Sequence, residues 1–338
     1  MKEEKFKKIY KEKIKEFQKH NYLYFEKNAP ILDDASFDEL KKEIILLEKK
    51  HPSLKNKESP SLNVGFKPSK IFKKVAHKSP MLSLGNAFDE EDLLNFEKKI
   101  LNFLNLEKGF KVEYSAEPKI DGISASLIYI DGKFQKGLSR GDGKQGEDIT
   151  ANLKTIADIP ERILDTEFPK EIDIRGEVFI QNSDFKSLKD KFANPRNAAS
   201  GSLRQKNSEE TKKIPLKFIA YTYGFEKGLK VKNQKDFLLL LKKWGFKTNP
   251  LNITTNGIKN LISNYNEIEK KRGNIDFDID GIVYKVNSFE LQKRLGYVAN
   301  SPRWAIAHKF SANKGISKIE NIEIQIGRTG ALTPVAKI

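Results

Sequence analysis

Three short segments, far apart in the sequence, each have the pattern of a β-strand that carries one lysine among apolar residues. They are "EYSAEPKIDG" with Lys119, "DIDGIVYKV" with Lys285 and "WAIAHKF" with Lys309. An apolar strand has no packing reason to hold a strongly hydrated ammonium group, because burying an unpaired charge is costly. We therefore predict one sheet whose strands direct these lysines into a shared basic pocket. Repulsion within that pocket would lower the pKa of one lysine, and the others could bind phosphate.

Carboxylates accompany these lysines. On an alternating strand, Glu117, Lys119 and Asp121 point to the same face, and Gly122 permits close approach of another backbone. Asp280 lies in the second segment, and the strand "IRGEVF" also combines a basic residue with an acid. A single K-x-D-G tetrapeptide recurs by chance, and alone it is better explained by a surface lysine paired with its neighbours. The repeated pattern instead favours a site that uses a neutral amine as a nucleophile.

The remaining pattern predicts an α+β protein. Two amphipathic helices are expected, one over 2–20 and one that begins at a capping-box pattern formed by Ser36 and Glu39. A polar linker over 57–70 precedes a loop and helix within 79–104. Strands and helices then alternate without a regular βαβ order, which favours antiparallel sheets. The expected strands are 110–117, 123–130, 133–140, 171–180, 216–223, 279–287 and 304–310, and the later helices lie near 183–192, 234–244 and 258–272.

Composition narrows the class of protein. The formal net charge of +16 favours a polyanionic partner such as nucleic acid, but a Lys-rich proteome from an AT-rich genome explains it equally well. There is no cysteine and the four histidines are scattered, which leaves no disulfide framework and no evident metal-ligand spacing. No apolar run reaches the roughly 18 residues of a membrane span, and the N-terminus lacks a signal-peptide core. We therefore expect a cytosolic protein.

The hexapeptide "GDGKQG", residues 141–146, fits the G-x-G-x-x-G dinucleotide fingerprint. No long amphipathic helix starts there and no βαβ unit surrounds it, so the context that the fingerprint requires is missing. We interpret these glycines as a turn beside Arg140.

Several long segments, in order and spacing, resemble the nucleotidyltransferase motifs of DNA ligases, and most closely those of bacterial NAD-dependent DNA ligases. The segments that carry this resemblance are "YLYFEKNAPILDDASFDEL", "EPKIDGISASLIY", "SRGDGKQGEDIT", "RGEVF", "FANPRNAASGSLRQ", "FDIDGIVYKVNS", "SPRWAIAHKF" and "IGRTGALTPVAKI". The resemblance implies a nucleotidyltransferase fold of antiparallel sheets with flanking helices. It divides the chain into a helical NAD-binding module over 1–68, an adenylation domain over 69–317 and the beginning of an OB-fold over 318–338.

The resemblance also implies a reaction and the residues that perform it. Lys119 would take AMP from NAD as a lysine–adenylate, releasing nicotinamide mononucleotide, and Asp121 and Asp280 would support the lysine and the Mg²⁺ chemistry. Residues expected to bind the nucleotide are Glu117 at the adenine, Arg140 and Glu177 at the ribose, Lys285 and Lys309 at the nucleotide and its α-phosphate, and Ser83 and Leu84 near the adenylate. Residues expected to hold the nicotinamide mononucleotide half are Tyr24, Asp34 and Asp38. We assign no residue as a dedicated metal ligand.

The AMP would then pass to the 5′-phosphate of nicked double-stranded DNA in replication and repair, in the bacterial cytosol near the nucleoid. Arg196, Arg204 and Arg272 match positions used on DNA or in later steps, and the residues that flank the first two predict an exposed loop. We expect a monomer that adenylates itself. We also expect it to seal nicks poorly, because the family continues through further DNA-clamping modules.

Two positions depart from the family pattern: Phe25 stands where histidine is common, and Phe37 stands where tyrosine is common. Phenylalanine keeps the stacking ability but loses the hydrogen bond, so we expect altered affinity for the nicotinamide half. His308 stands where the family usually has an apolar residue, and the sequence offers no reason for it.

Two other classes of function compete with this interpretation. An ATP- or GTP-using nucleotidyltransferase would share the K-x-D-G core, but residues 1–55 argue against it. A non-catalytic DNA-binding protein with a relic ligase fold would be expected to lose part of the charged set, which is intact here.

Overall fold

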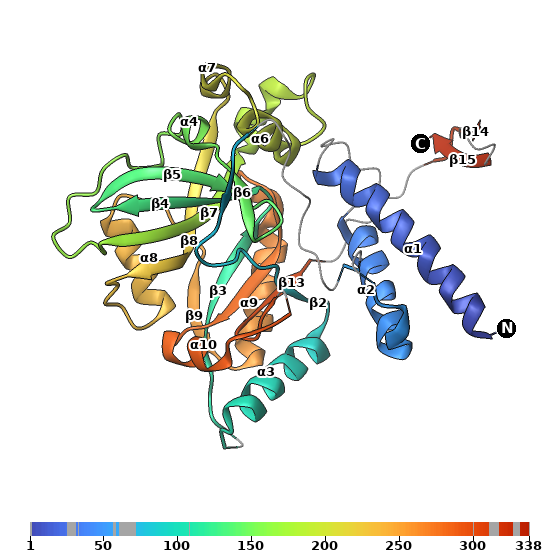
Figure 1. The fold of residues 1–338 in the computed structure, drawn as a ribbon, viewed down its shortest axis with the longest axis horizontal. Coiled ribbons are helices and arrows are strands. Elements are labelled where there is room, and N and C mark those ends of the chain that lie inside the picture. Colours follow the sequence, from blue (N-terminus) through green and yellow to red (C-terminus); the bar gives the residue numbers. More distant parts are fainter. Residues whose placement is uncertain are drawn as a thin grey trace.

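The computed structural model describes residues 2–25, 32, 34–56, 59–60, 72–107, 109–299, 301–310, 318–326 and 332–337. Figure 1 shows two sheets with flanking helices, a pair of N-terminal helices beside them, and a C-terminal hairpin. The predicted α+β class with antiparallel sheets is confirmed. The one parallel pair among the described strands is β2 (Gly85–Ala87) with β13 (Ala305–Lys309). None of the described helices combines the length and the apolar character needed to cross a membrane.

The N-terminal helices are α1 (Lys2–Phe25) and α2 (Asp34–Lys50), and a 3₁₀ turn over Pro52–Leu54 follows them. Their apolar stripes face each other, as the helical periodicity predicts. The buried members of the two stripes are Tyr10, Ile14, Phe17, Leu40 and Ile44. The predicted helical hairpin is therefore confirmed, although α1 continues to Phe25 and not only to residue 20.

The larger sheet has five strands in the order β2-β13-β10-β3-β9. Its central strands are β10 (Ile279–Val286) and β3 (Glu113–Ile120), and β9 (Ile253–Asn256) forms the edge beside β3. Helices α3 (Glu90–Leu104), α9 (Ile258–Lys271) and α10 (Phe289–Leu295) bury apolar residues in one core with this sheet. Tyr114 of β3 and Tyr284 of β10 are fully buried in that core. Successive residues of these strands point in turn to the core and to the other face of the sheet. The other face of the same strands is left for polar side chains.

The second sheet has four antiparallel strands in the order β5-β4-β7-β8. They are β5 (Lys133–Ser139), β4 (Ile123–Ile130), β7 (Glu171–Ile180) and β8 (Leu216–Lys227). The accompanying helices are α4 (Thr150–Leu153), α5 (Asn182–Phe185), a 3₁₀ turn over Lys186–Leu188, α6 (Pro195–Leu203), α7 (Ser208–Lys212) and α8 (Gln234–Lys243). A second apolar core fills the space between this sheet and its helices.

The chain passes from the first sheet to the second immediately after Lys119, since β3 ends at Ile120 and β4 begins at Ile123. Gly122 makes the crossing possible, because a Cβ there would lie 2.4 Å from the carbonyl oxygen of Val178. The glycine of K-x-D-G thus lets two sheets meet beside the lysine.

Three short pairs of strands and one further 3₁₀ turn complete the described elements. They are β1 (Lys74–Ala76) with β6 (Gln145–Glu147), β11 (Tyr297–Val298) with β12 (Ser301–Pro302), β14 (Asn321–Ile326) with β15 (Leu332–Lys337), and the 3₁₀ turn Arg272–Asn274. "GDGKQG" forms the turn from β5 into β6, with no long helix after it, as predicted. The OB-fold assignment of the C-terminal hairpin stays a prediction.

Two expectations about local structure were wrong. The segment 183–192 is only α5 and a 3₁₀ turn, so it is shorter than the predicted helix. "NPRNAASGSL" is not an exposed loop but helix α6, most of whose residues are buried. Asn194 caps this helix, because its side chain accepts a hydrogen bond from the Asn197 backbone, and Pro195 occupies the first turn, where its missing N–H costs nothing.

His308 lies on the core side of β13. Its ring stacks on Tyr265 with the centroids 4.0 Å apart, and its Nδ1 lies 3.3 Å from the hydroxyl of Tyr284. Burial lowers the pKa of His308 to about 4, so the ring is neutral near pH 7. The structure therefore gives this residue a packing role between aromatic rings.

Candidate active site

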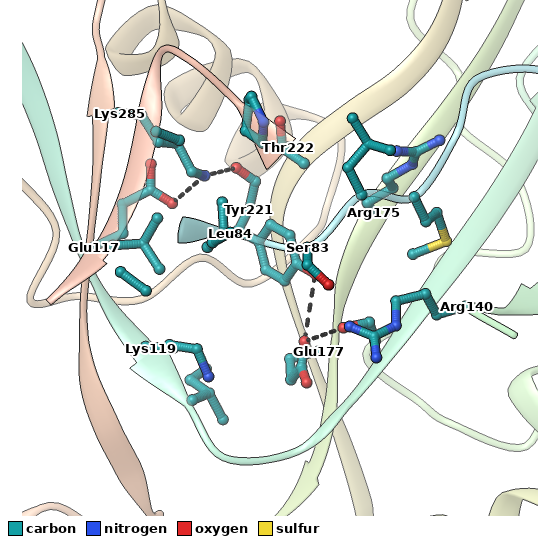
Figure 2. Close-up of a pocket in the computed structure, with 18 of the residues that line it drawn as sticks. Ser83, Leu84, Glu117, Lys119, Arg140, Arg175, Glu177, Tyr221, Thr222 and Lys285 are labelled. Atoms are coloured by element: carbon teal, nitrogen blue, oxygen red, sulfur yellow. Dashed lines mark hydrogen bonds and ion pairs between the residues drawn. The ribbon is translucent and has the colours of Figure 1, made fainter. Parts of the chain in front are cut away.

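A cavity of about 420 Å³ lies where the two sheets and the N-terminal helices meet. Figure 2 shows its labelled side chains arriving from several strands, with Glu117, Lys119 and Lys285 on one side and Arg140 and Arg175 on the other. Most of the predicted site residues line the cavity. They are Asp38, Ser83, Leu84, Glu117, Lys119, Arg140, Glu177, Arg196, Asp280, Lys285 and Lys309.

The three lysine-bearing strands are neighbours, as predicted. In the register of the larger sheet, Gly281 of β10 stands opposite Lys119 of β3 and opposite Lys309 of β13. Residues that stand opposite each other project from the same face of a sheet. Lys285 lies on this face as well, since it follows Gly281 by two pleats. One face of one sheet therefore carries all three ammonium groups.

A β-bulge between Ile279 and Gly281 directs Asp280 to these lysines. A bulge adds one residue to a strand and changes the direction of the side chain at that point. Both carboxylate oxygens of Asp280 accept from the Lys119 ammonium, at 2.9 and 2.8 Å, and Lys309 Nζ lies 3.6 Å away. Burial acts to raise the pKa of Asp280, but Lys119 and Lys309 outweigh it and hold that pKa below its usual range.

Glu117 and Lys285 form a buried ion pair at 2.7 Å, and their side chains are 5 % and 7 % exposed. Lys285 also donates to the carbonyl oxygen of Tyr221 at 2.9 Å. The other oxygen of Glu117 accepts from Ser115 and from the Gln234 amide, each at 2.9 Å. A buried ion pair needs such additional hydrogen bonds to offset the free energy of removing its charges from water.

Glu177 stands on β7 of the second sheet and lines the same cavity as Lys119 (Figure 2). Its Oε2 accepts hydrogen bonds from Ser124 at 3.0 Å and from the Tyr221 hydroxyl at 3.3 Å. Burial raises the pKa of Glu177 to about 7, although Arg196, Lys119 and Arg140 oppose that shift. A carboxyl group with such a pKa can both donate and accept hydrogen bonds near neutral pH.

The raised pKa of Glu177 predicts a dependence of stability on pH. The folded state binds this proton more tightly than the unfolded state does. The stabilisation is therefore complete below the unfolded pKa of 4.5 and is lost as the pH rises to about 7. We expect the free energy of unfolding of the wild type, minus that of Glu177→Gln, to fall across this window. Urea unfolding at a series of pH values measures it, and parallel profiles for the two proteins would contradict the assignment.

Arg175 on β7 fixes the segment that contains Ser83 and Leu84. Its guanidinium donates to Asp173 at 2.8 Å and to the carbonyl oxygen of Pro80 at 2.9 Å. Arg175 and Asp173 are both buried. Both charged residues of the strand "IRGEVF" line the cavity, and Arg175 also anchors the loop at the cavity wall.

The N-terminal helices contribute through α2. Asp38 forms an ion pair with Lys309 at 2.5 Å, so a helix near the N-terminus contacts a strand near residue 309. Lys41, one turn further along α2, also lines the cavity. Burial lowers the pKa of Lys41; Asp38 opposes this shift, and Arg140 and Lys309 add to it. The side chains of Tyr24, Phe25 and Asp34 lie outside the described residues.

The three arginines expected on DNA have different environments. Arg196, in the first turn of α6, lines the cavity and pairs with Asp121 at 2.6 Å. Arg204 follows α6 and lies 3.3 Å from buried Glu147, while Arg272 lies over the ring of Phe310 at 5.3 Å. Asp121 itself comes after the end of β3, so it does not continue the alternating face that was predicted for it.

Among the residues not predicted from the sequence are Lys41 and Tyr221, which line the cavity, and Gln234, which donates a hydrogen bond to the cavity residue Glu117. Lys41 had a signal, since a residue three positions after Asp38 on a helix shares its face. Gln234 had none, because its contacts with Glu117 and with the carbonyl oxygen of Tyr221, at 2.7 Å, join distant parts of the chain.

The described residues contain no group of three or more carboxylates or histidines placed to hold a metal ion. Mg²⁺ does not need such a group when it arrives with phosphates, because it then takes one or two carboxylates and keeps phosphate and water oxygens as its other ligands. Asp121 and Asp280, at the Lys119 end of the cavity, fit this limited role.

A lysine near the end of a strand with the sequence K-x-D-G, in a charged cavity between two largely antiparallel sheets, is typical of the nucleotidyltransferase class. Two family models match the chain. Residues 69–313 match the NAD-dependent DNA ligase adenylation domain, and residues 3–65 match the N-terminal NAD⁺-binding domain of DNA ligases. The chain belongs to the NAD-dependent DNA ligase adenylation domain family, which confirms the resemblance found in the sequence.

Similar proteins agree with this family. A DNA ligase of Pelagibacter ubique is 70% identical over 329 residues, which cover 97% of this chain and 49% of that protein. A DNA ligase of Xanthobacter autotrophicus is 48% identical, over 94% of this chain and 45% of that protein. The chain thus spans about half the length of these relatives. The solved structure of a putative ATP-dependent DNA ligase from Aquifex aeolicus is a distant likeness, with a TM-score of 0.39 and 16% identity over 67% of this chain and 48% of that one.

Proposed function

We propose that this chain is the adenylation portion of an NAD-dependent DNA ligase and that Lys119 is its nucleophile. The Lys119 amine attacks the α-phosphorus of NAD, a P–N bond forms, and the P–O bond to nicotinamide mononucleotide breaks. The observation that carries this proposal is the position of Lys119, which Asp280 holds in a cavity lined by cations within the matched adenylation domain.

Attack requires the neutral amine, so the Lys119 ammonium must first lose a proton. Asp280 contacts Nζ with both oxygens and holds it in place, while the nearby Lys309 ammonium would favour loss of the proton from Lys119 to water. The paired ammonium also has a fixed position on a strand, which lowers the entropy cost of in-line attack. Mg²⁺ bound with NAD, held by Asp121 and Asp280, would neutralise charge on the phosphates.

The remaining cavity residues would bind the adenylate. Glu117 and Lys285, at the buried end, suit the hydrogen-bonding edge of adenine, while Arg140 and Glu177 suit the ribose. Lys309 suits the α-phosphate, because its ammonium group and that of Lys119 both face Oδ2 of Asp280 and therefore lie close together. Ser83 and Leu84 would cover the nucleotide from the cavity wall. Tyr24, Asp34 and Asp38 would hold the nicotinamide half.

The AMP on Lys119 would next pass to the 5′-phosphate of nicked DNA, and the 3′-hydroxyl would then expel it. We propose Arg196, Arg204 and Arg272 for contacts in these steps. Arg196 then acts from within the cavity, where it pairs with Asp121. We further propose the division into 1–68, 69–317 and 318–338, a monomeric state, a location in the bacterial cytosol, and poor nick sealing by this portion alone.

The choice of nucleotide donor tests this function. Incubation with NAD and Mg²⁺ is expected to add the mass of one AMP to the intact chain, whereas ATP adds none and removal of Mg²⁺ prevents the gain. Intact-mass spectrometry measures each result. A gain from ATP but not from NAD would favour the ATP-using class of enzyme. No gain from either donor would favour a non-catalytic DNA-binding protein.

A further inference from the structure

Lys41 is a cavity residue for which the family resemblance supplies no role. It lies on α2, between Asp38 and the buried core residue Ile44, and it lines the same cavity as Lys119. We propose that Lys41 binds the phosphate of the nicotinamide mononucleotide half of NAD and stabilises that phosphate as it leaves. This inference rests on the proposed function and adds a residue to its substrate site.

The ion pairs of the cavity single out Lys41. Lys119 pairs with Asp280, Lys285 with Glu117, Arg196 with Asp121 and Lys309 with Asp38. Within the part of the chain that the structure describes, Lys41 forms no ion pair and no hydrogen bond through its ammonium group. The nearest acid on its own helix face, Asp38, is engaged by Lys309 at 2.5 Å. A half-buried ammonium group without an ion-pair partner is costly in free energy, and an anionic ligand would remove that cost.

The position of Lys41 indicates which of the two phosphates of NAD it would bind, namely that of the nicotinamide mononucleotide half. The α-phosphate must lie beside Lys119, on the large sheet. Lys41 instead lines the cavity from α2, a helix that belongs to the segment matching the NAD⁺-binding domain, residues 3–65. The charges of Arg140 and Lys309 both act on Lys41, which puts it at the border between the helices and the sheets. The bridging oxygen of the pyrophosphate would then lie between Lys41 on the helix and the cations Lys119 and Lys309 on the large sheet.

A cation at this point contributes to the reaction itself. When the P–O bond breaks, the electron pair stays on the nicotinamide mononucleotide phosphate, which gains negative charge. A positioned ammonium stabilises that charge more in the transition state than in bound NAD. Lys41 would therefore act in the formation of the lysine–adenylate and not in later steps, in which nicotinamide mononucleotide is absent.

Binding of two probes that differ only in the phosphate tests the proposal. Nicotinamide mononucleotide and nicotinamide riboside are titrated by calorimetry into the wild type, Lys41→Met, Lys41→Arg and Lys49→Met. The last is the matched control, since Lys49 is exposed on the same helix. We expect Lys41→Met to weaken binding of the mononucleotide about tenfold or more, as loss of a charged hydrogen bond implies. Lys41→Arg and Lys49→Met should remain within about threefold of the wild type.

Binding of the riboside should be the same in all four proteins. If Lys41→Met weakens binding of the riboside as much as binding of the mononucleotide, the proposal is overturned, because the variant then disturbs α2 in general. Unchanged binding of the mononucleotide in that variant, or no saturable binding to the wild type, would also overturn it. The AMP adduct on the wild type is a separate readout. If the adduct fails to form while binding of the mononucleotide still depends on Lys41, the proposed function is lost and the phosphate site remains.

Discussion

Lys119→Arg is expected to gain no AMP under conditions in which the wild type becomes fully adenylated by NAD and Mg²⁺. Arginine keeps the positive charge and can keep the ion pair with Asp280, so the cavity retains its electrostatic balance. A guanidinium cannot be deprotonated in a protein and therefore offers no nucleophilic nitrogen. We expect the rate of adduct formation to fall by at least about 10⁴-fold, as for loss of a nucleophile in other enzymes. Intact-mass spectrometry over a time course measures this.

The matched control is Lys213→Arg, the same exchange at an exposed lysine that pairs with Glu210 on the surface. It should be adenylated at the rate of the wild type. Peptide mapping of the wild-type adduct should place AMP on the peptide that contains Lys119. A full adduct on Lys119→Arg would mean that another lysine is the nucleophile, and the cavity lysines Lys41 and Lys309 would then be tested first.

The position of Lys119 could be predicted because it depends on local patterns. Three apolar strands with one lysine each are visible in the sequence, and a shared sheet is the simplest way to bring the lysines together. The partner of Lys119 was harder to predict. Asp280 reaches it beside a bulge in β10, and that bulge appears in the pairing of β10 with β3, a strand far away in the sequence. No pattern within the segment itself indicates that shift.

The error at α6 has a different cause. Asn-Pro and Gly-Ser are turn signals, but Asn followed by Pro is also the start signal of a helix. Burial decides between the two, since α6 packs on β7 and its small residues Ala198 and Ala199 are fully buried. Small residues carry little hydrophobic signal, so periodicity could not reveal this helix. Arg196 therefore enters the cavity from a rigid element and not from a loop.

Lys41 and Gln234 show the limit of inference from one sequence. Lys41 lines the cavity from α2, and Gln234 supports the cavity from α8 through a 2.9 Å hydrogen bond to Glu117. Side chains of this kind become visible only when the fold has brought the segments together. The strand patterns revealed charges on both sheets, such as Lys119 and Glu177, whereas Lys41 of α2 had to be found from the structure.

The largest effect on stability is expected at the buried pair of Glu117 and Lys285. Lys285→Met leaves the Glu117 carboxylate in a buried site without its cation, although Ser115 and Gln234 still donate to it. Removal of one partner of a buried pair costs about 3–5 kcal/mol, mostly because the remaining charge is uncompensated. We expect a loss of that size in the free energy of unfolding, measured by urea unfolding with the fluorescence of buried Trp244 as the signal.

The double variant Glu117→Gln/Lys285→Met separates this explanation from a simple loss of packing. If the unpaired charge causes the effect, removal of both charges should restore at least about 2 kcal/mol relative to Lys285→Met, since an apolar replacement of a whole pair is often close to neutral. Lys271→Met breaks the exposed pair with Glu267 and should leave the free energy of unfolding close to that of the wild type, because solvent screens such a pair. If the double variant is as unstable as the sum of the single variants, the pair contributes no coupling energy. The cavity would then be held together by apolar packing and not by its matched charges.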